Sequence, residues 1–323
     1  MGYHREFVQM VEKNGVEVVD FGMVYTSEGA YAKASEMAGA GVDLIMCNMV
    51  TYATSSVFAP IIRDVNVPMI LIALQPREGL DYSKASTFMQ LENDNICSVP
   101  EFIGVANCLG KKIHDVVIGT LYNDAEAQAE VARWCDIAMV LHDLKGARIG
   151  LMGHALEAMY DMHADPTAVS AAFGLHVPLL EIDDVLDVYE TVTEEEIAAK
   201  IAVIDAEFDM PEPVSDPVTS KLTDEDKYQA AKSAVALDKF VEKYNLTGLA
   251  YYYEGQEGSL KKYHGKPGSG ASVEFKIKEG DITMLGITQT AEGKFKFVIG
   301  VGRHADTIKK IADILGIEAV IVK

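Results

Sequence analysis

The chain has 323 residues, 28 of them basic and 49 acidic, so its formal net charge at neutral pH is −21. With 49% apolar and 24% charged residues it can bury a sizeable core, which excludes disorder over most of its length. The acidic balance argues against nucleic acid and against an anionic membrane surface as partners, because both require clustered Lys and Arg.

The sequence also bears on where the protein is located and on whether its cysteines are oxidised. No apolar stretch is long enough to cross a membrane, and the first residues contain no secretory signal. The four cysteines form no C-x-x-C pair, which predicts buried thiols in a reducing compartment; they are Cys47, Cys97, Cys108 and Cys135. We therefore predict a cytoplasmic protein.

The first half of the chain alternates helix-like and strand-like stretches. Helices are predicted at residues 3–14, 28–40, 100–112 and 124–144, and strands at 16–23, 42–48 and 67–74. The last two strands are near-continuous apolar runs, which are typical of strands covered on both faces in a parallel sheet. A β-α-β-α order indicates an α/β layer fold.

The second half begins with another α/β pattern and then changes. Strands are predicted at 147–152, 177–182 and 247–254, and helices at 166–173, 194–208 and 224–244, with a proline-rich linker at 211–218. Asp165-Pro166 is a typical helix start, and Thr193 with Glu196 fits a capping box. Antiparallel β-structure follows at 272–278, 282–290 and 294–301, with a turn at 291–293, and then a helix at 306–315 and a strand at 318–322.

These patterns predict an α/β protein with three domains. Two are Rossmann-like or flavodoxin-like parallel-sheet domains at residues 1–146 and 147–258, the first without its opening strand. The third is a small β-rich C-terminal unit at residues 259–323.

The strongest local pattern follows the strand predicted at residues 147–152. Ligands of open α/β sheets bind outside the carboxyl ends of the strands, where these residues lie. Acids and bases gathered there could hydrogen-bond a polyol, and the substrate-binding candidates are His154, Glu157, Asp161 and His163. The alternative is a surface loop whose polar groups only cap the next helix.

Two further positions could hold a metal or move a proton. Glu254 ends an aromatic strand, where a carboxylate can serve as metal ligand or general base, although an acidic end of an edge strand explains it equally well. His304 precedes a helix for which Asp306 is the expected N-cap, and capping does not explain the histidine. The glycine-rich stretch at 263–270 lacks P-loop spacing and is typical of a β-turn.

Five segments, in order and over most of the chain, resemble the L-arabinose isomerase and L-fucose isomerase family, most closely its arabinose isomerase-like members; they lie at 42–76, 147–177, 247–255, 264–275 and 302–323. The resemblance implies two α/β domains with a β-rich C-terminal domain, and a homo-oligomer, trimer or hexamer. It implies interconversion of aldose and ketose through an enediol assisted by Mn²⁺, which polarises the sugar carbonyl. It also implies that Glu254 is a metal ligand and acid/base catalyst, and His304 a metal ligand.

The chain also departs from the family pattern. A second metal glutamate and a further metal histidine have no counterpart, and family segments are missing near residues 258–263 and 300–301. The resemblance is therefore to a shortened member. Two functions follow: isomerisation of L-arabinose or a related sugar, or a non-catalytic, sugar-binding scaffold on the same fold.

Overall fold

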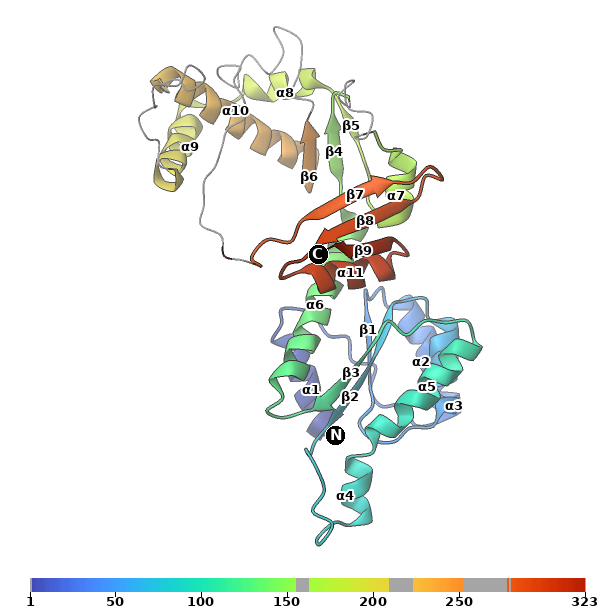
Figure 1. The fold of residues 1–323 in the computed structure, drawn as a ribbon. Coiled ribbons are helices and arrows are strands. Elements are labelled where there is room, and N and C mark those ends of the chain that lie inside the picture. The colour runs from blue at the N-terminus through green and yellow to red at the C-terminus, as the bar shows by residue number, and fades with distance from the viewer. Residues whose placement is uncertain (1, 155–162, 209–222, 252–277, 279, 323) are drawn as a thin grey trace. The chain divides into compact units, whose positions relative to one another are not determined.

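The computed structural model describes residues 2–154, 163–208, 223–251, 278 and 280–322. These residues belong to two compact units (Figure 1). The first contains residues 1–143, 283–287 and 296–323, and the second contains residues 144–282 and 288–295.

A parallel sheet forms the centre of the first unit. The helices and strands up to residue 146 are α1 (Gly2–Glu12), α2 (Ser27–Gly39), β1 (Ile45–Asn48), α3 (Ser55–Asp64), β2 (Met69–Gln75), α4 (Thr87–Glu92), the 3₁₀ helix η1 (Asn95–Cys97), α5 (Ser98–Cys108), β3 (Asp115–Thr120) and α6 (Ala125–Gly146). The strand order is β1-β2-β3 and both pairs are parallel.

Helices cover both faces of this sheet. Successive side chains of the central strand β2 point to opposite sides, so each face of the sheet has its own apolar cluster. On one face Leu71 belongs to an apolar cluster with Phe58 of α3 and Phe102 of α5, whose rings stack at a centroid distance of 4.2 Å. On the other face Ile72 belongs to a cluster with Trp134 of α6. Burial on both faces confirms the prediction for β2, whereas the edge strand β1 is only partly buried.

Two predictions for this unit need correction. Residues 16–23 form no strand, and no backbone hydrogen bond joins them to β1 in the described chain. Strand β3 was not predicted, because its apolar core of Val116, Val117 and Ile118 is short and is flanked by Asp115 and Gly119. It pairs with β2 in parallel, so the three-stranded sheet contains β3 and lacks the strand predicted at residues 16–23.

A second three-stranded sheet lies in the second unit. Its elements are β4 (Ile149–Met152), α7 (Pro166–Phe173), β5 (Leu179–Leu180), α8 (Ile182–Tyr189), α9 (Glu194–Glu207), α10 (Asp224–Lys243) and β6 (Gly248–Tyr251). The order is β5-β4-β6 and both pairs are parallel, as predicted for this α/β part of the chain. Met152 and Phe240 are both fully buried in its apolar cluster.

Helix ends in this unit follow the sequence signals. Asp165 caps α7 by accepting from the Thr167 amide at 2.8 Å, and Gly174 ends the helix in the left-handed conformation, with φ of 74°. Thr193 and Glu196 form the predicted capping box of α9. Helix α8 was not predicted.

The capping box of α9 gives a first testable prediction. Hydrogen bonds from Lys239 and from the Thr193 amide lower the pKa of Glu196 to about 2, so its carboxylate is charged at neutral pH. Replacing Thr193→Ala removes the acceptor for the Glu196 amide and should lower the free energy of unfolding by about 1 kcal/mol in urea denaturation. The matched control is Thr54→Ala, because Thr54 is the N-cap of α3 but accepts no capping hydrogen bond. Equal losses in both variants would contradict the prediction.

A third, small sheet combines the predicted hairpin with the last strand. Its elements are β7 (Leu285–Gln289), β8 (Phe295–Gly300), α11 (Ala305–Ile314) and β9 (Glu318–Val322). Thr290 donates to the Lys294 carbonyl at 2.7 Å and closes the turn, in which Gly293 has φ of 76°. The order is β7-β8-β9, and β9 runs parallel to β8 after α11. The third predicted antiparallel stretch, 272–278, lies almost entirely outside the described residues.

The cysteine prediction holds only in part. Cys135 is fully buried in α6, and burial raises the pKa of its thiol to about 11. Cys97 and Cys108 are exposed, so the prediction of four buried thiols is wrong for these two. They end η1 and α5, on turns that face solvent rather than the sheet. No described helix combines the length and the apolarity that a membrane crossing needs.

Candidate functional site

The residues predicted to bind sugar follow the carboxyl end of β4. Gly153 turns the chain with φ of 81°, and His154 follows it at the surface. His163 is also exposed and lies two residues before the N-cap of α7. Glu157 and Asp161 lie outside the described residues, so the full set remains a prediction.

The two strands that precede these sequence motifs, β4 and β6, are neighbours in one sheet. Strand β6 pairs directly with the central strand β4, with Tyr251 opposite Met152. The chain leaves β6 toward Glu254, three residues further on, and leaves β4 toward His154. Glu254 itself lies outside the described residues. The carboxyl ends of neighbouring parallel strands meet at one edge, where α/β folds bind ligands.

His304 begins α11 in the first unit. Its backbone amide donates to Thr283 Oγ1 at 2.9 Å, and its carbonyl accepts from Ile308 at 2.9 Å, so it is the N-cap residue. The prediction of Asp306 as N-cap is therefore wrong. Asp306 lies in the first turn, where its charge favours the helix dipole. The His304 side chain is exposed.

A metal site requires several ligating side chains that converge on one point. Within the described ranges, no three His, Cys, Asp or Glu side chains gather in a way that could hold a metal ion. His304 therefore has no set of described co-ligands. A hard cation needs several converging ligands, so the described residues do not fit a Mn²⁺ site.

The polar side chains after β1 are engaged within the first unit. Thr51 Oγ1 donates to the Leu91 carbonyl at 2.7 Å, and the Ala53 amide donates to Ser98 Oγ at 2.7 Å. Tyr52 donates to Glu101 at 2.6 Å. These contacts join the loop to α4 and α5 and favour a structural role.

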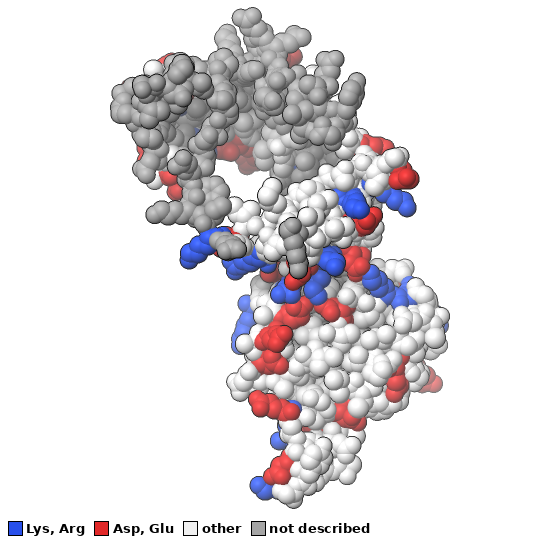
Figure 2. Space-filling model, in the orientation of Figure 1, with Lys and Arg blue, Asp and Glu red and all other residues white. Residues whose placement is uncertain are grey.

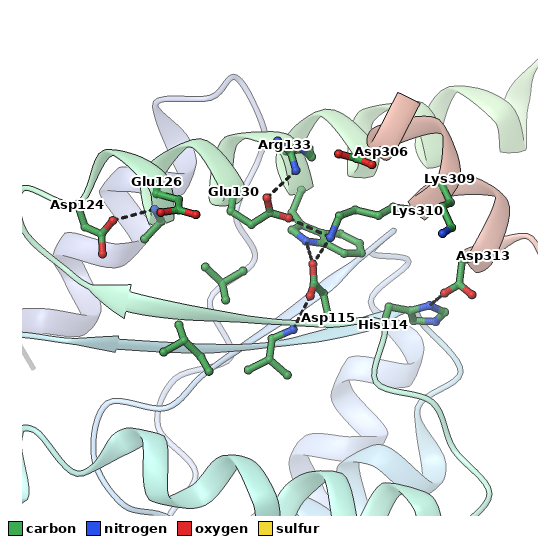
Figure 3. A pocket seen from close by; sticks show the side chains of 15 residues that line it. His114, Asp115, Asp124, Glu126, Glu130, Arg133, Asp306, Lys309, Lys310 and Asp313 are labelled. Carbon is green, nitrogen blue, oxygen red and sulfur yellow. Dashed lines mark hydrogen bonds and ion pairs between the residues drawn. The ribbon is translucent and has the colours of Figure 1, made fainter. Parts of the chain in front are cut away.

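A charged cavity that the sequence did not reveal lies between β3, α6 and α11 (Figure 3). Its volume is about 580 Å³. Its charged and histidine side chains, most of them acidic, are His114, Asp115, Asp124, Glu126, Glu130, Arg133, Asp306, Lys309, Lys310 and Asp313. Figure 2 shows acidic and basic side chains adjoining over α6 and α11.

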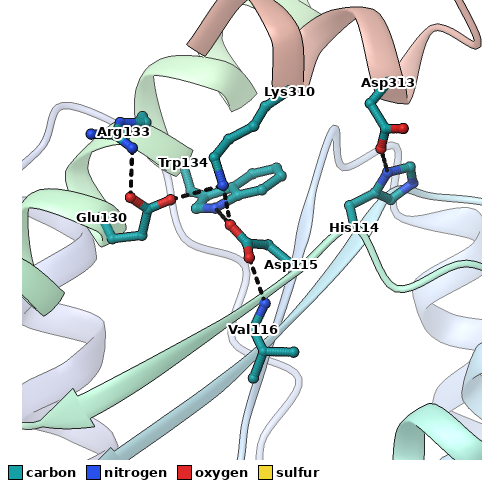
Figure 4. Close-up of polar contacts among 8 residues, drawn as sticks. All are labelled: His114, Asp115, Val116, Glu130, Arg133, Trp134, Lys310 and Asp313. Atoms are coloured by element: carbon teal, nitrogen blue, oxygen red, sulfur yellow. Dashed lines mark hydrogen bonds and ion pairs between the residues drawn. The ribbon is translucent and has the colours of Figure 1, made fainter. Parts of the chain in front are cut away.

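Lys310 is the centre of the contacts in this cavity (Figure 4). Its ammonium is hydrogen-bonded to Asp115, lies 3.0 Å from Glu130 Oε1, and sits 4.9 Å from the centroid of the Trp134 ring. Trp134 Nε1 donates to Asp115 at 2.9 Å. Arg133 pairs with the other oxygen of Glu130 at 2.8 Å. Asp115 of β3 and Glu130 of α6 are thus both paired with Lys310 of α11. Asp115 also accepts from Trp134, and Glu130 also pairs with Arg133.

The protonation of this cluster follows from its contacts. Burial raises the pKa of Asp115, but the hydrogen bonds from Lys310 and Trp134 outweigh burial and leave the pKa below its ordinary value. Burial lowers the pKa of Lys310, but Asp115 and Glu130 outweigh it and raise the pKa. Both groups are charged at neutral pH. Because Asp115 begins β3, the cluster lies at the amino end of the strand, opposite the usual ligand edge. The ion pairs of this cluster hold α11 against the sheet, and Asp115 and Lys310 are paired with each other and are not available as a free acid or base.

The fold defines the chain as an α/β protein with small parallel sheets. The candidate ligand-binding site is at the sheet edge where β4 and β6 end. No family model matches the chain. It is similar to an L-arabinose isomerase of Cellvibrio japonicus (strain Ueda107), with 22% identity over 219 residues, and to one of Aeromonas salmonicida (strain A449), with 22% identity over 217 residues. The matches cover 68% and 66% of this chain but 42% of each relative, so the chain spans about two fifths of their length. The similarity indicates a distant relationship.

Proposed function

We propose that this chain binds L-arabinose or a related small sugar, as a distant relative of aldose–ketose isomerases. The observation that carries this proposal is the pairing of β4 with β6, by which the segments that begin at His154 and lead to Glu254 leave one sheet edge. The similarity to L-arabinose isomerases supports the sugar as the ligand class. Imidazole and carboxylate groups at such an edge can donate to and accept from sugar hydroxyls.

Isomerisation is the further activity that the resemblance suggests. Glu254 would then act as acid/base and metal ligand and His304 as metal ligand, with Mn²⁺ polarising the sugar carbonyl. The described residues do not fit that metal. We also infer from the resemblance two flavodoxin-like domains, a cytoplasmic location and a homo-oligomer, trimer or hexamer; sedimentation of the whole chain tests the last.

Titration calorimetry with L-arabinose, L-fucose and their ketoses tests the binding proposal. We expect saturable binding of at least one sugar, weakened roughly tenfold by His154→Ala, because one hydrogen bond to a polar ligand is lost. Glu254→Gln should weaken the same binding. The matched control is His142→Ala, which removes an exposed histidine of the first unit and should leave the affinity unchanged.

The outcomes separate the two functions. No heat with any of these sugars would reject sugar binding. Binding without ketose formation on incubation with Mn²⁺ would support the sugar-binding protein and reject isomerisation. Ketose formation that Glu254→Gln abolishes would establish the isomerase activity.

A further inference from the structure

A cavity of the first unit lies beside the free edge of β1. Its volume is about 920 Å³, and its two main walls are residues 15–25 and residues 40–54. Strand β1 is at the edge of its sheet, and no backbone hydrogen bond crosses the cavity between these described segments. We call this cavity the β1 slot.

Backbone groups of β1 point into the slot. Ile45 donates to the Pro68 carbonyl at 2.9 Å and Met49 donates to the Ile72 carbonyl at 3.0 Å, so odd-numbered residues of β1 face β2. Because peptide groups alternate in direction along a strand, Met46 and Asn48 present their amides and carbonyls to the other side. A row of such groups is a template for another strand.

In the opposite wall, residues 15–25, side chains reach both faces of the sheet, as they would in a neighbouring strand. Val18 packs into the apolar cluster that holds Met46, on one face of the sheet. Phe21 packs into the cluster that holds Met49, on the other face. Its side chains therefore reach both faces without any hydrogen bond to β1. Val19, by contrast, is 46% exposed, as expected of a segment that lacks a neighbour.

The chemistry of the slot favours a peptide over a small molecule. Pockets for small ligands are about 300–1,000 Å³ with a few converging polar groups. This slot is near the upper limit of that range, and its interior is mostly apolar and bounded by a strand edge. Its charged rim is mainly acidic; the residues are Glu17, Asp20, Asp43 and Asp143, with His4 and His142 paired to Asp20 and Asp43.

We propose that the β1 slot binds an extended segment of a partner protein as an added β-strand, apolar in its centre and carrying Lys or Arg at its ends. Backbone hydrogen bonds to Met46 and Asn48 supply affinity, and apolar side chains fill the spaces on both faces. The acidic rim selects basic flanks and disfavours acidic ones. This inference is independent of the sugar-binding edge after β4.

The test uses the whole chain and a fluorescein-labelled peptide of alternating valine and isoleucine with lysine at both ends. Fluorescence anisotropy should show saturable binding. Replacing two central valines by proline should weaken it roughly tenfold or more, because proline cannot donate to the ladder. Replacing the lysines by glutamate should also weaken it. Hydrogen exchange at the amides of Met46 and Asn48 should slow when the lysine peptide binds.

Protein variants locate the peptide. The double variant Asp20→Lys, Asp43→Lys reverses the charge of the rim. It should weaken binding of the lysine peptide and strengthen binding of the glutamate peptide. The matched double variant Glu78→Lys, Asp81→Lys, in an exposed loop, should change neither. Met46→Pro removes a donor on the open side only and should also weaken binding. Should Met46→Pro fail to fold, the charge reversal still decides.

Three results would overturn this assignment. One is the absence of saturable binding at millimolar peptide. Another is equal binding of the proline and parent peptides, which would mean that no strand is added. The third is a concentration-dependent dimer that the charge reversal abolishes, which would assign the slot to a second copy of this chain.

Discussion

Replacing Trp134→Ala is expected to lower the free energy of unfolding of the first unit by about 3–5 kcal/mol, the range for large-to-small changes of a buried aromatic residue. Trp134 is fully buried, and its ring packs in the cluster on one face of β2. The substitution leaves a cavity and removes a donor from Asp115. Trp134→Phe keeps most of the volume and should cost less, about 1–3 kcal/mol, chiefly from the lost hydrogen bond to a charged group.

The measurement is urea denaturation followed by circular dichroism, because Trp134 is the only tryptophan and its replacement removes the fluorescent probe. In the unmodified chain, tryptophan fluorescence reports the first unit alone. The control is Phe88→Ala: Phe88 is 71% exposed on α4, and its loss should change stability by less than about 0.5 kcal/mol. A loss below about 1 kcal/mol for Trp134→Ala would show that this face of the sheet does not depend on the ring.

The sequence was sufficient to predict a helix, strand or turn where the residues that determine that element lie next to it in the chain. The apolar run of β2 predicted a strand buried on both faces, and the Thr193–Glu196 box marked the start of α9. The turn predicted at 291–293 marked the hairpin, which the hydrogen bond from the Thr290 amide to the Lys294 carbonyl closes. In each case the signal lies within a few residues of the element that it specifies.

Partners far apart in the chain could not be predicted in this way. Asp115 and Lys310 are 195 positions apart, and neither has a local pattern that indicates the other. Residues 16–23 have the composition of a strand, but a strand also needs a hydrogen-bonded neighbour, which the sequence pattern does not provide. The neighbouring position of β4 and β6 is similarly a property of the topology, and it alone relates the motifs at His154 and Glu254.

Replacing Lys310→Met is expected to destabilise the first unit by about 1–3 kcal/mol at neutral pH. Methionine keeps an apolar chain over Trp134 but leaves Asp115 and Glu130 without their ammonium partner. Breaking a fully buried pair costs about 3–5 kcal/mol. These carboxylates are 27% and 24% exposed, so water offsets part of that cost. Lys33→Met is the matched control, because its pair with Glu36 is a surface pair worth about 0–1 kcal/mol.

The pH dependence of this difference distinguishes a charge effect from a packing effect. The folded-state pKa of Asp115 is lowered, so its contribution is present above the ordinary carboxyl pKa of about 4 and is lost as pH falls through the lowered value. The folded-state pKa of Lys310 is raised, so its contribution is present below about pH 10.4 and is lost as pH rises through the raised value. The stability difference between the unmodified chain and Lys310→Met, measured by urea denaturation across pH, should therefore be largest in the neutral range and shrink on both sides. A difference that stays constant from acid to alkaline pH would mean that Lys310 fastens α11 by packing alone.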